Sequence, residues 1–135
     1  MHRGAWTALA AVVVAGLIGA GLVANQIDAR QRLEARVRAL THGGDPAAGR
    51  LAIERRTCGG CHEVPGVPTA VGKVGPSLDG IASRVYIAGR LENTPDNMMR
   101  WITDPQSIEP GNAMPPTGVA GQEARNIAAY LYTLE

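Results

Sequence analysis

The residues with the clearest chemistry in this sequence are two cysteines and a histidine that stand close together. Cys58 and Cys61 are separated by two glycines, His62 follows at once, and the chain of 135 residues has no other cysteine. This C-x-x-C-H spacing is the attachment signature of c-type haem, in which each thiol bonds to one vinyl group and the histidine ligates the iron. We therefore expect one covalently bound haem c, held by Cys58, Cys61 and His62.

Other uses of the two cysteines fit the sequence less well. A disulfide between thiols only three positions apart would close a strained loop, and a thioredoxin-like pair requires a βαβ setting that this Gly- and Pro-rich sequence does not show. Half of a zinc site and a thiol redox pair remain the alternatives to haem.

A second iron ligand can be sought among the methionines and the other histidines, because a histidine-ligated electron-transfer haem usually carries Met or His on its other face. Met114 lies in a loop bounded by prolines, which is stiff and cannot be a helix interior. Met98 and Met99 have the helical spacing of core residues, and neither His2 nor His42 lies in such a loop. We expect Met114 to be the ligand, and the alternative is an ordinary buried loop methionine.

Residues 44–135 resemble a class I cytochrome c over their whole length. The family's landmarks occur in order, namely Gly44-Asp-Pro-Ala-Ala-Gly49, the C-x-x-C-H pentad, Gly75-Pro-Ser-Leu78, Pro110-Gly-Asn-Ala-Met-Pro115 and Ile127-Ala-Ala-Tyr-Leu131. The resemblance implies a small all-α fold wrapped around one haem, and a one-electron carrier of a respiratory chain. With His and Met on the iron no position is open to a substrate, so the chain is expected not to be an enzyme.

The resemblance also implies roles for residues around the haem. In the family, a carbonyl at the position of Pro76 accepts a hydrogen bond from the proximal imidazole. A Trp at the position of Trp101 donates to a haem propionate. Arg84 and Tyr86 are weaker candidates for the same contact, since an arginine is suited to carboxylates but is more often simply exposed.

The sequence predicts three helices in this domain and no strand. They begin near residue 46, run from about 95 to 103 before the next proline, and run from about 122 to 134. Asp45 is the expected N-cap of the first helix, and Asn93 or Thr94 that of the second. In the family the first and last helices cross at a glycine, so Gly49 should lie against Tyr130. Residues 63–80 are rich in Gly, Pro and Val and should be loop.

The N-terminal segment has the composition of a membrane anchor. Residues 4–24 carry no charge, and as a helix they would be about 31 Å long, close to the roughly 30 Å of a bilayer's hydrocarbon core. We expect an anchor or uncleaved signal over residues 1–24, a charged helical tether with a Gly43-Gly44 hinge over 25–43, and the haem domain over 44–135. A cleaved signal, which would release a soluble carrier, is the alternative.

Positive charge near the anchor argues for one orientation and the resemblance for the other. Arg30, Arg32, Arg36 and Arg38 follow the anchor, whereas only Arg3 and the amino terminus precede it, so this count would place the domain in the cytoplasm. In the family, haem attachment is completed on the outer face of the bacterial membrane. We therefore expect a single-pass protein of the cytoplasmic membrane with its haem domain on the periplasmic face.

The charge and composition of residues 44–135 limit the partners. They carry eight basic and ten acidic side chains, so the lysine ring of mitochondrial members is missing and nucleic-acid binding has no support. We expect a membrane respiratory complex or terminal oxidase as partner, met through an apolar rim at residues 64–68 and 70–71. The chain can instead be a tight subunit of a terminal oxidase, or a haem enzyme or gas sensor with an open sixth site.

Overall fold

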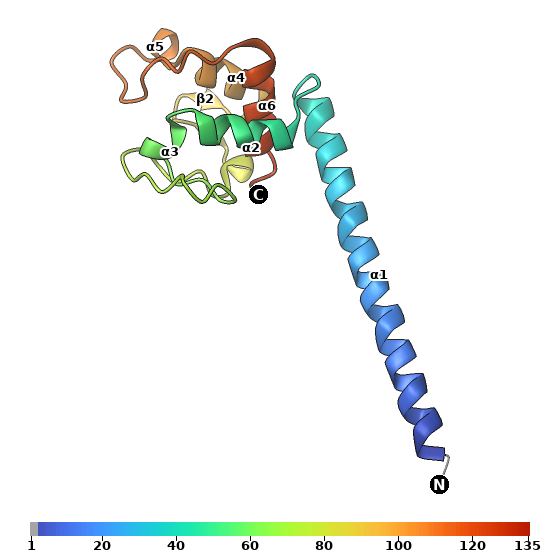
Figure 1. Cartoon of the computed structure of the whole chain (residues 1–135). Helices are drawn as coiled ribbons and strands as arrows, with labels where there is room; N and C mark the ends of the chain where they lie inside the picture. The colour runs from blue at the N-terminus through green and yellow to red at the C-terminus, as the bar shows by residue number, and fades with distance from the viewer. Residues whose placement is uncertain (1–2) are drawn as a thin grey trace. The chain divides into compact units, whose positions relative to one another are not determined.

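The structure is a computed structural model that describes the backbone of residues 3–135 and the side chains from residue 9 onward (Figure 1). Contacts between residues divide the chain into two units, Met1–Leu33 and Glu34–Glu135. The second is called the C-terminal unit below. Residues 1 and 2 of the predicted anchor, including His2, lie outside the described residues, as does the side chain of Arg3.

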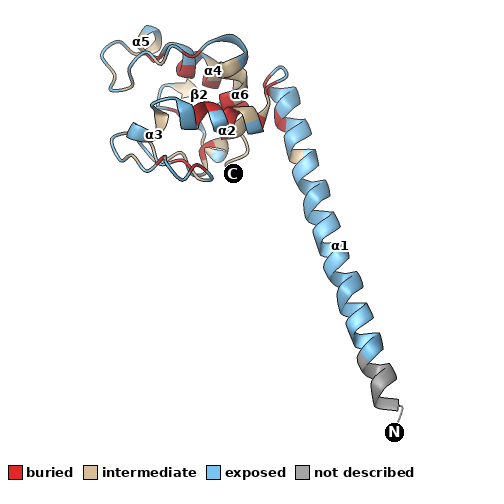
Figure 2. Ribbon diagram, in the orientation of Figure 1, coloured by how far each residue is buried: buried red, intermediate tan, exposed pale blue. Residues whose placement is uncertain are grey.

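Helix α1 spans Arg3–Leu40 without a break. Every side chain from residue 9 to 32 is exposed, so this part has no face that packs on protein (Figure 2). Among the described residues one helical stretch, Leu9–Leu40, is long and apolar enough to cross a membrane. The predicted anchor is therefore a helix of suitable length and composition.

The last turns of α1 belong to the C-terminal unit. His42 adopts a left-handed backbone conformation (φ 52°), and the Gly43 amide donates to the Arg38 carbonyl at 2.8 Å, which is the Schellman pattern of a helix end. The Thr41 hydroxyl donates to the Val37 carbonyl at 2.6 Å. The helix thus ends in a defined turn.

This turn is packed against the rest of the C-terminal unit. Val37 is 1% and Thr41 0% exposed, and the Gln122 amide donates to the Gly43 carbonyl at 3.0 Å. A Cβ on Gly44 would lie 2.3 Å from the Arg125 carbonyl oxygen, so this glycine is needed for close approach. Gly43 and Gly44, which the sequence predicts to be a hinge, are therefore packed against Gln122 and Arg125. The C-terminal unit begins at Glu34, before the predicted start of the haem domain at residue 44.

Helices α2 (Pro46–Arg55) and α6 (Gly121–Leu131) form the most extensive helix pair of the C-terminal unit (Figure 1). Asp45 caps α2 as predicted, accepting from the Ala47 and Ala48 amides. A Cβ on Gly49 would lie 1.9 Å from the Asn126 carbonyl oxygen and 3.0 Å from Tyr130 Cβ. The expected crossing at Gly49 is confirmed, and α6 ends three residues before the predicted position 134.

The middle of the chain is built from short elements. They are α3 (Cys58–Cys61), the 3-10 turn η1 (Ile81–Ser83), β1 (Tyr86–Ile87), β2 (Leu91–Glu92), α4 (Pro95–Thr103) and α5 (Pro105–Ile108). Helix α4 has the predicted bounds, and the Thr94 hydroxyl accepts from the Asn97 amide. The expectation of no strand is wrong for the antiparallel pair β1–β2, whose two-residue strands are too short for an alternating pattern.

Buried side chains come mainly from α2, α4 and α6 (Figure 2). Ile53, Met98 and Ile127 belong to this core, and Met99 is partly buried against it. The expectation that both methionines are core residues is therefore confirmed. The fold is mostly helical, as predicted.

Candidate functional site

The C-x-x-C-H pentad forms a single helical turn after α2. Both thiols are free and partly exposed, and the His62 amide donates to the Cys58 carbonyl at 2.8 Å. Gly59 lies against Ala70, where an added Cβ would stand 2.8 Å from the Ala70 Cα. The turn therefore presents two cysteines and a histidine together, next to the loop of residues 63–80.

His62 is held in place through its side chain. Its Nδ1 lies 2.8 Å from the Pro76 carbonyl oxygen, and the Gly75 amide donates to the Cys61 carbonyl at 2.8 Å. An Nδ1–H donating to this carbonyl leaves Nε2 as the nitrogen able to bind a metal. The structure thus contains the contact expected of Pro76, and the ligand role of His62 stays a prediction.

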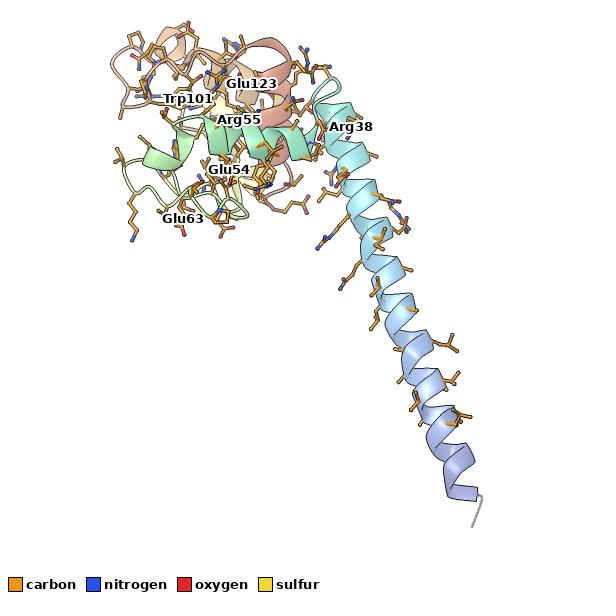
Figure 3. All side chains as sticks on the ribbon, in the orientation of Figure 1. Arg38, Glu54, Arg55, Glu63, Trp101 and Glu123 are labelled. Atoms are coloured by element: carbon orange, nitrogen blue, oxygen red, sulfur yellow. The ribbon has the colours of Figure 1, made fainter. Side chains whose placement is uncertain are left out.

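The surroundings of Cys58 act on its thiol in opposite directions. Burial raises the pKa of Cys58, and the nearby Arg56 guanidinium opposes this rise. Arg56 pairs at 2.5 Å with Glu123 of α6, which is labelled in Figure 3. This hydrogen bond holds the pKa of the Glu123 carboxyl below its usual range. Burial is the larger of these influences on the thiol.

Met114 lies in an irregular segment between α5 and α6. Its side chain is partly buried against the core. The Met114 amide donates to Asn112 Oδ1 at 2.8 Å, and its carbonyl accepts from Gln106 Nε2 at 2.7 Å. Sequence reasoning identified the stiff loop but missed these two amides, although Asn in a Pro-Gly-Asn turn commonly bonds to its own backbone.

The three candidates for propionate contacts differ in their surroundings. Trp101, labelled in Figure 3, is 9% exposed, and its indole N–H has no hydrogen-bond acceptor among the described residues. Arg84 donates to the Ser77 and Asp79 carbonyls at 2.5 and 2.9 Å, and Tyr86 is exposed. Trp101 is the buried one of the three candidates, and all three roles stay predictions.

Three residues of the predicted apolar rim are interior. Val64, Val67 and Ala70 are 2–3% exposed and belong to the core, whereas Val71 is 67% exposed. These three residues turn inward and bond to one another through their backbones, whereas Gly66 and Pro68 between them are exposed. The expectation that Val67 forms a contact surface is therefore wrong, and Val71 is the exposed valine of that segment.

These features fit a covalently attached haem. The donor set comprises two free thiols one turn apart, an imidazole oriented by a carbonyl, and a thioether on a proline-bounded loop. An indole N–H without a protein acceptor suits a propionate. Among the described residues no group of three or more His, Cys, Asp and Glu side chains could hold a metal ion.

Comparisons with known proteins find cytochromes c. The family model described as Cytochrome c matches residues 46–135. Cytochrome c2 of Rhodoblastus acidophilus is 35% identical over 103 residues, which cover 65% of this chain and 91% of that protein. The c-type cytochrome SorU of Sinorhizobium meliloti is a similar solved structure, with 25% identity, a TM-score of 0.45, and coverage of 66% of this chain and 88% of that one.

Subunits of bacterial oxidases are also similar to the chain. Cytochrome c oxidase subunit 2 of Alkalihalophilus pseudofirmus is 40% identical over 88 residues, covering 64% of this chain and 25% of that subunit. The same subunit of Bacillus subtilis is 31% identical over 86 residues. The chain therefore spans about a quarter of the length of the oxidase subunits it matches.

Proposed function

Since the chain belongs to the cytochrome c family and carries covalently bound haem c for electron transfer, we propose that it is a one-electron carrier of a respiratory chain. In this proposal His62 and Met114 would be the two iron ligands. The observation that carries it is the contact between His62 Nδ1 and the Pro76 carbonyl, because it leaves Nε2 as the ring nitrogen that would bind the iron. The haem, when bound, supplies an iron that cycles between ferric and ferrous states.

The residues around the site hold and shield the group without reacting. Pro76 fixes the His62 ring, Gln106 and Asn112 hold the backbone of Met114, and Trp101 offers its N–H to a carboxylate. With His62 and Met114 both bound to the iron, no coordination position would remain for a substrate. We therefore propose that the protein is not an enzyme.

Helix α1 supports a membrane attachment for this carrier. Its apolar residues are exposed along a stretch long enough to span a bilayer, and lipid contact would remove that surface from water. We propose a single-pass protein of the bacterial cytoplasmic membrane. Its haem domain would lie on the periplasmic face, since that is where the family completes haem attachment.

The redox partner in this proposal is a membrane respiratory complex or terminal oxidase. Similarity to subunit 2 of bacterial cytochrome c oxidases supports this choice. The same similarity favours a second candidate, in which the chain is itself a tightly bound subunit of such an oxidase. Both candidates require the same closed haem site.

The carrier role can be tested with the full-length holoprotein in phospholipid vesicles that contain a bacterial cytochrome c oxidase lacking a haem of its own in subunit 2. After reduction by ascorbate, the haem should be reoxidised in oxygen only when the oxidase is present, with one electron delivered per chain. A Cys58→Ser, Cys61→Ser double variant should transfer none. Reoxidation without oxidase, or rapid carbon monoxide binding by the reduced protein, would instead support an enzyme or gas sensor.

The oxidase-subunit alternative needs a different measurement. Membranes of the source cell solubilised in a mild detergent should release the carrier as a single chain. Stable comigration with oxidase subunits through two chromatographic steps, without crosslinking, would support the subunit role.

A further inference from the structure

Gln106 occupies the start of the segment that carries Met114. It is the second residue of α5, whose first residue, Pro105, is fully buried, and its own side chain is partly buried. Asp104 caps this turn by accepting from the Ser107 amide at 3.1 Å. Gln106 therefore projects from a turn that is anchored in the core.

The amide of Gln106 reaches three backbone groups of the Met114 loop. Its Oε1 accepts from the Gly111 amide at 2.9 Å, and its Nε2 donates to the Asn112 carbonyl at 3.0 Å and to the Met114 carbonyl at 2.7 Å. A glutamine amide has one carbonyl oxygen and two N–H donors. Both polar atoms of the Gln106 side chain are thus hydrogen-bonded to the same loop.

Asn112 completes the hold on Met114 from the other side. Its Oδ1 accepts from the Met114 amide at 2.8 Å, and its Nδ2 donates to the Pro105 and Glu109 carbonyls at 3.0 and 2.7 Å. The backbone N–H and C=O of Met114 are therefore both hydrogen-bonded to side chains. Gln106 belongs to α5, and Asn112 is bonded to the Pro105 carbonyl of α5.

The loop has little else to fix its position. In the described part of the chain, no backbone–backbone hydrogen bond outside helices and strands involves residues 113–118. The nearest support further along is the Thr117 hydroxyl, which donates to the Ile102 carbonyl at 2.7 Å. The position of Met114 consequently depends on side-chain hydrogen bonds, and Gln106 makes three of them.

We propose that Gln106 is the positioning residue for the sixth ligand, which sets how readily the Met114 thioether leaves the iron. A thioether is a neutral, weakly bound ligand, so its occupancy depends on how firmly the loop presents it. The proposal rests on the assignment of Met114 as ligand in the proposed function. It adds that a residue eight positions before the ligand controls ligand exchange and the reduction potential.

The test uses the full-length holoprotein and imidazole, which binds ferric iron only after the sixth ligand has left. Gln106→Ala should raise the rate of imidazole binding about tenfold or more, because all three hydrogen bonds from Gln106 to the loop are lost. The reduction potential should fall, since the ferrous state loses its soft ligand more often. Gln106→Glu keeps the length and an acceptor oxygen but loses both donors, so it should behave like Gln106→Ala.

Gln122→Ala is the matched control, because the amide of Gln122 bonds to Gly43 and Asn126 instead. It should leave the imidazole rate and the potential unchanged. Wild-type imidazole rates and potentials in both Gln106 variants would overturn the proposal, even if their thermal stability fell. Should Gln106→Ala not accumulate as holoprotein, the isosteric Gln106→Glu decides alone.

Met114→Ala separates this proposal from the one on which it rests. If Met114→Ala binds imidazole fast, wild type binds it slowly, and the Gln106 variants match wild type, only the role of Gln106 fails. If wild type already binds imidazole as fast as Met114→Ala, Met114 is not the ligand and the closed-site carrier fails as well.

Discussion

Gly75 lies so close to His62 that a Cβ on this glycine would stand 2.4 Å from His62 Cε1 and 2.7 Å from Nδ1. Two neighbouring backbone positions thus determine where the ring lies. Gly75 provides the space, and the Pro76 carbonyl provides the hydrogen bond at 2.8 Å. In a cytochrome, this arrangement sets both the orientation and the basicity of the proximal ligand.

Gly75→Ala should therefore disturb the ligand directly. The new methyl group must displace the ring from Pro76, and overpacking of this kind costs about 1–3 kcal/mol. We expect a lower melting temperature of the holoprotein and an altered potential. Gly60→Ala is the control, because its Cβ would meet nothing within 4 Å, and the expectation fails if the two variants have equal melting temperatures and potentials.

Val67→Asp tests the corrected position of this side chain. Val67 is 3% exposed, so the substitution would bury a carboxylate without a partner, at a cost of at least about 3 kcal/mol. Little folded holoprotein should accumulate. The matched change Val71→Asp, at a residue 67% exposed, should leave thermal unfolding nearly unchanged, and similar unfolding of the two variants would contradict the structure.

Val37→Ala tests whether the end of α1 is part of the C-terminal unit. Val37 is 1% exposed, and loss of its two methyl groups should lower the free energy of unfolding by on the order of 2 kcal/mol. Leu40→Ala should cost much less, because Leu40 is 42% exposed. Chemical denaturation followed at the haem band measures both, and an unchanged midpoint for Val37→Ala would indicate a detached tether.

Tyr132 should make stability depend on alkaline pH. Burial raises the pKa of Tyr132 to about 12, whereas an unfolded tyrosine titrates near 10. Between these values the folded state binds more protons, so this contribution is complete below about pH 10 and is lost as pH rises towards 12. Tyr132→Phe should flatten the decline in unfolding free energy over this range, and an unchanged slope would contradict the assignment.

The parts of the fold that could be predicted from sequence are those with local signals. Asp45 and Thr94 precede prolines that start helices, and each accepts the capping hydrogen bonds expected of it. Met114 stood out because prolines surround it. These features depend on neighbours in sequence, so a single sequence is enough to identify them.

The features that sequence reasoning missed depend on contacts between distant segments. Val67 looks like an exposed loop valine until the backbone bonds around it turn it inward. Gly44 looks like a hinge, yet its missing side chain permits contact with Arg125. Gln106 has no local signal at all, because its three partners are defined only once the loop closes over it.

Coordination of iron by Met114 is the central claim, and the methyl resonances of the four methionines test it most directly. With ¹³C-labelled methionine methyl groups in the reduced holoprotein, one resonance should lie far upfield, shifted by the porphyrin ring current, and Met114→Ala should abolish that resonance while leaving the other three. A spectrum without an upfield methyl, or one in which it survives in Met114→Ala, would contradict the account.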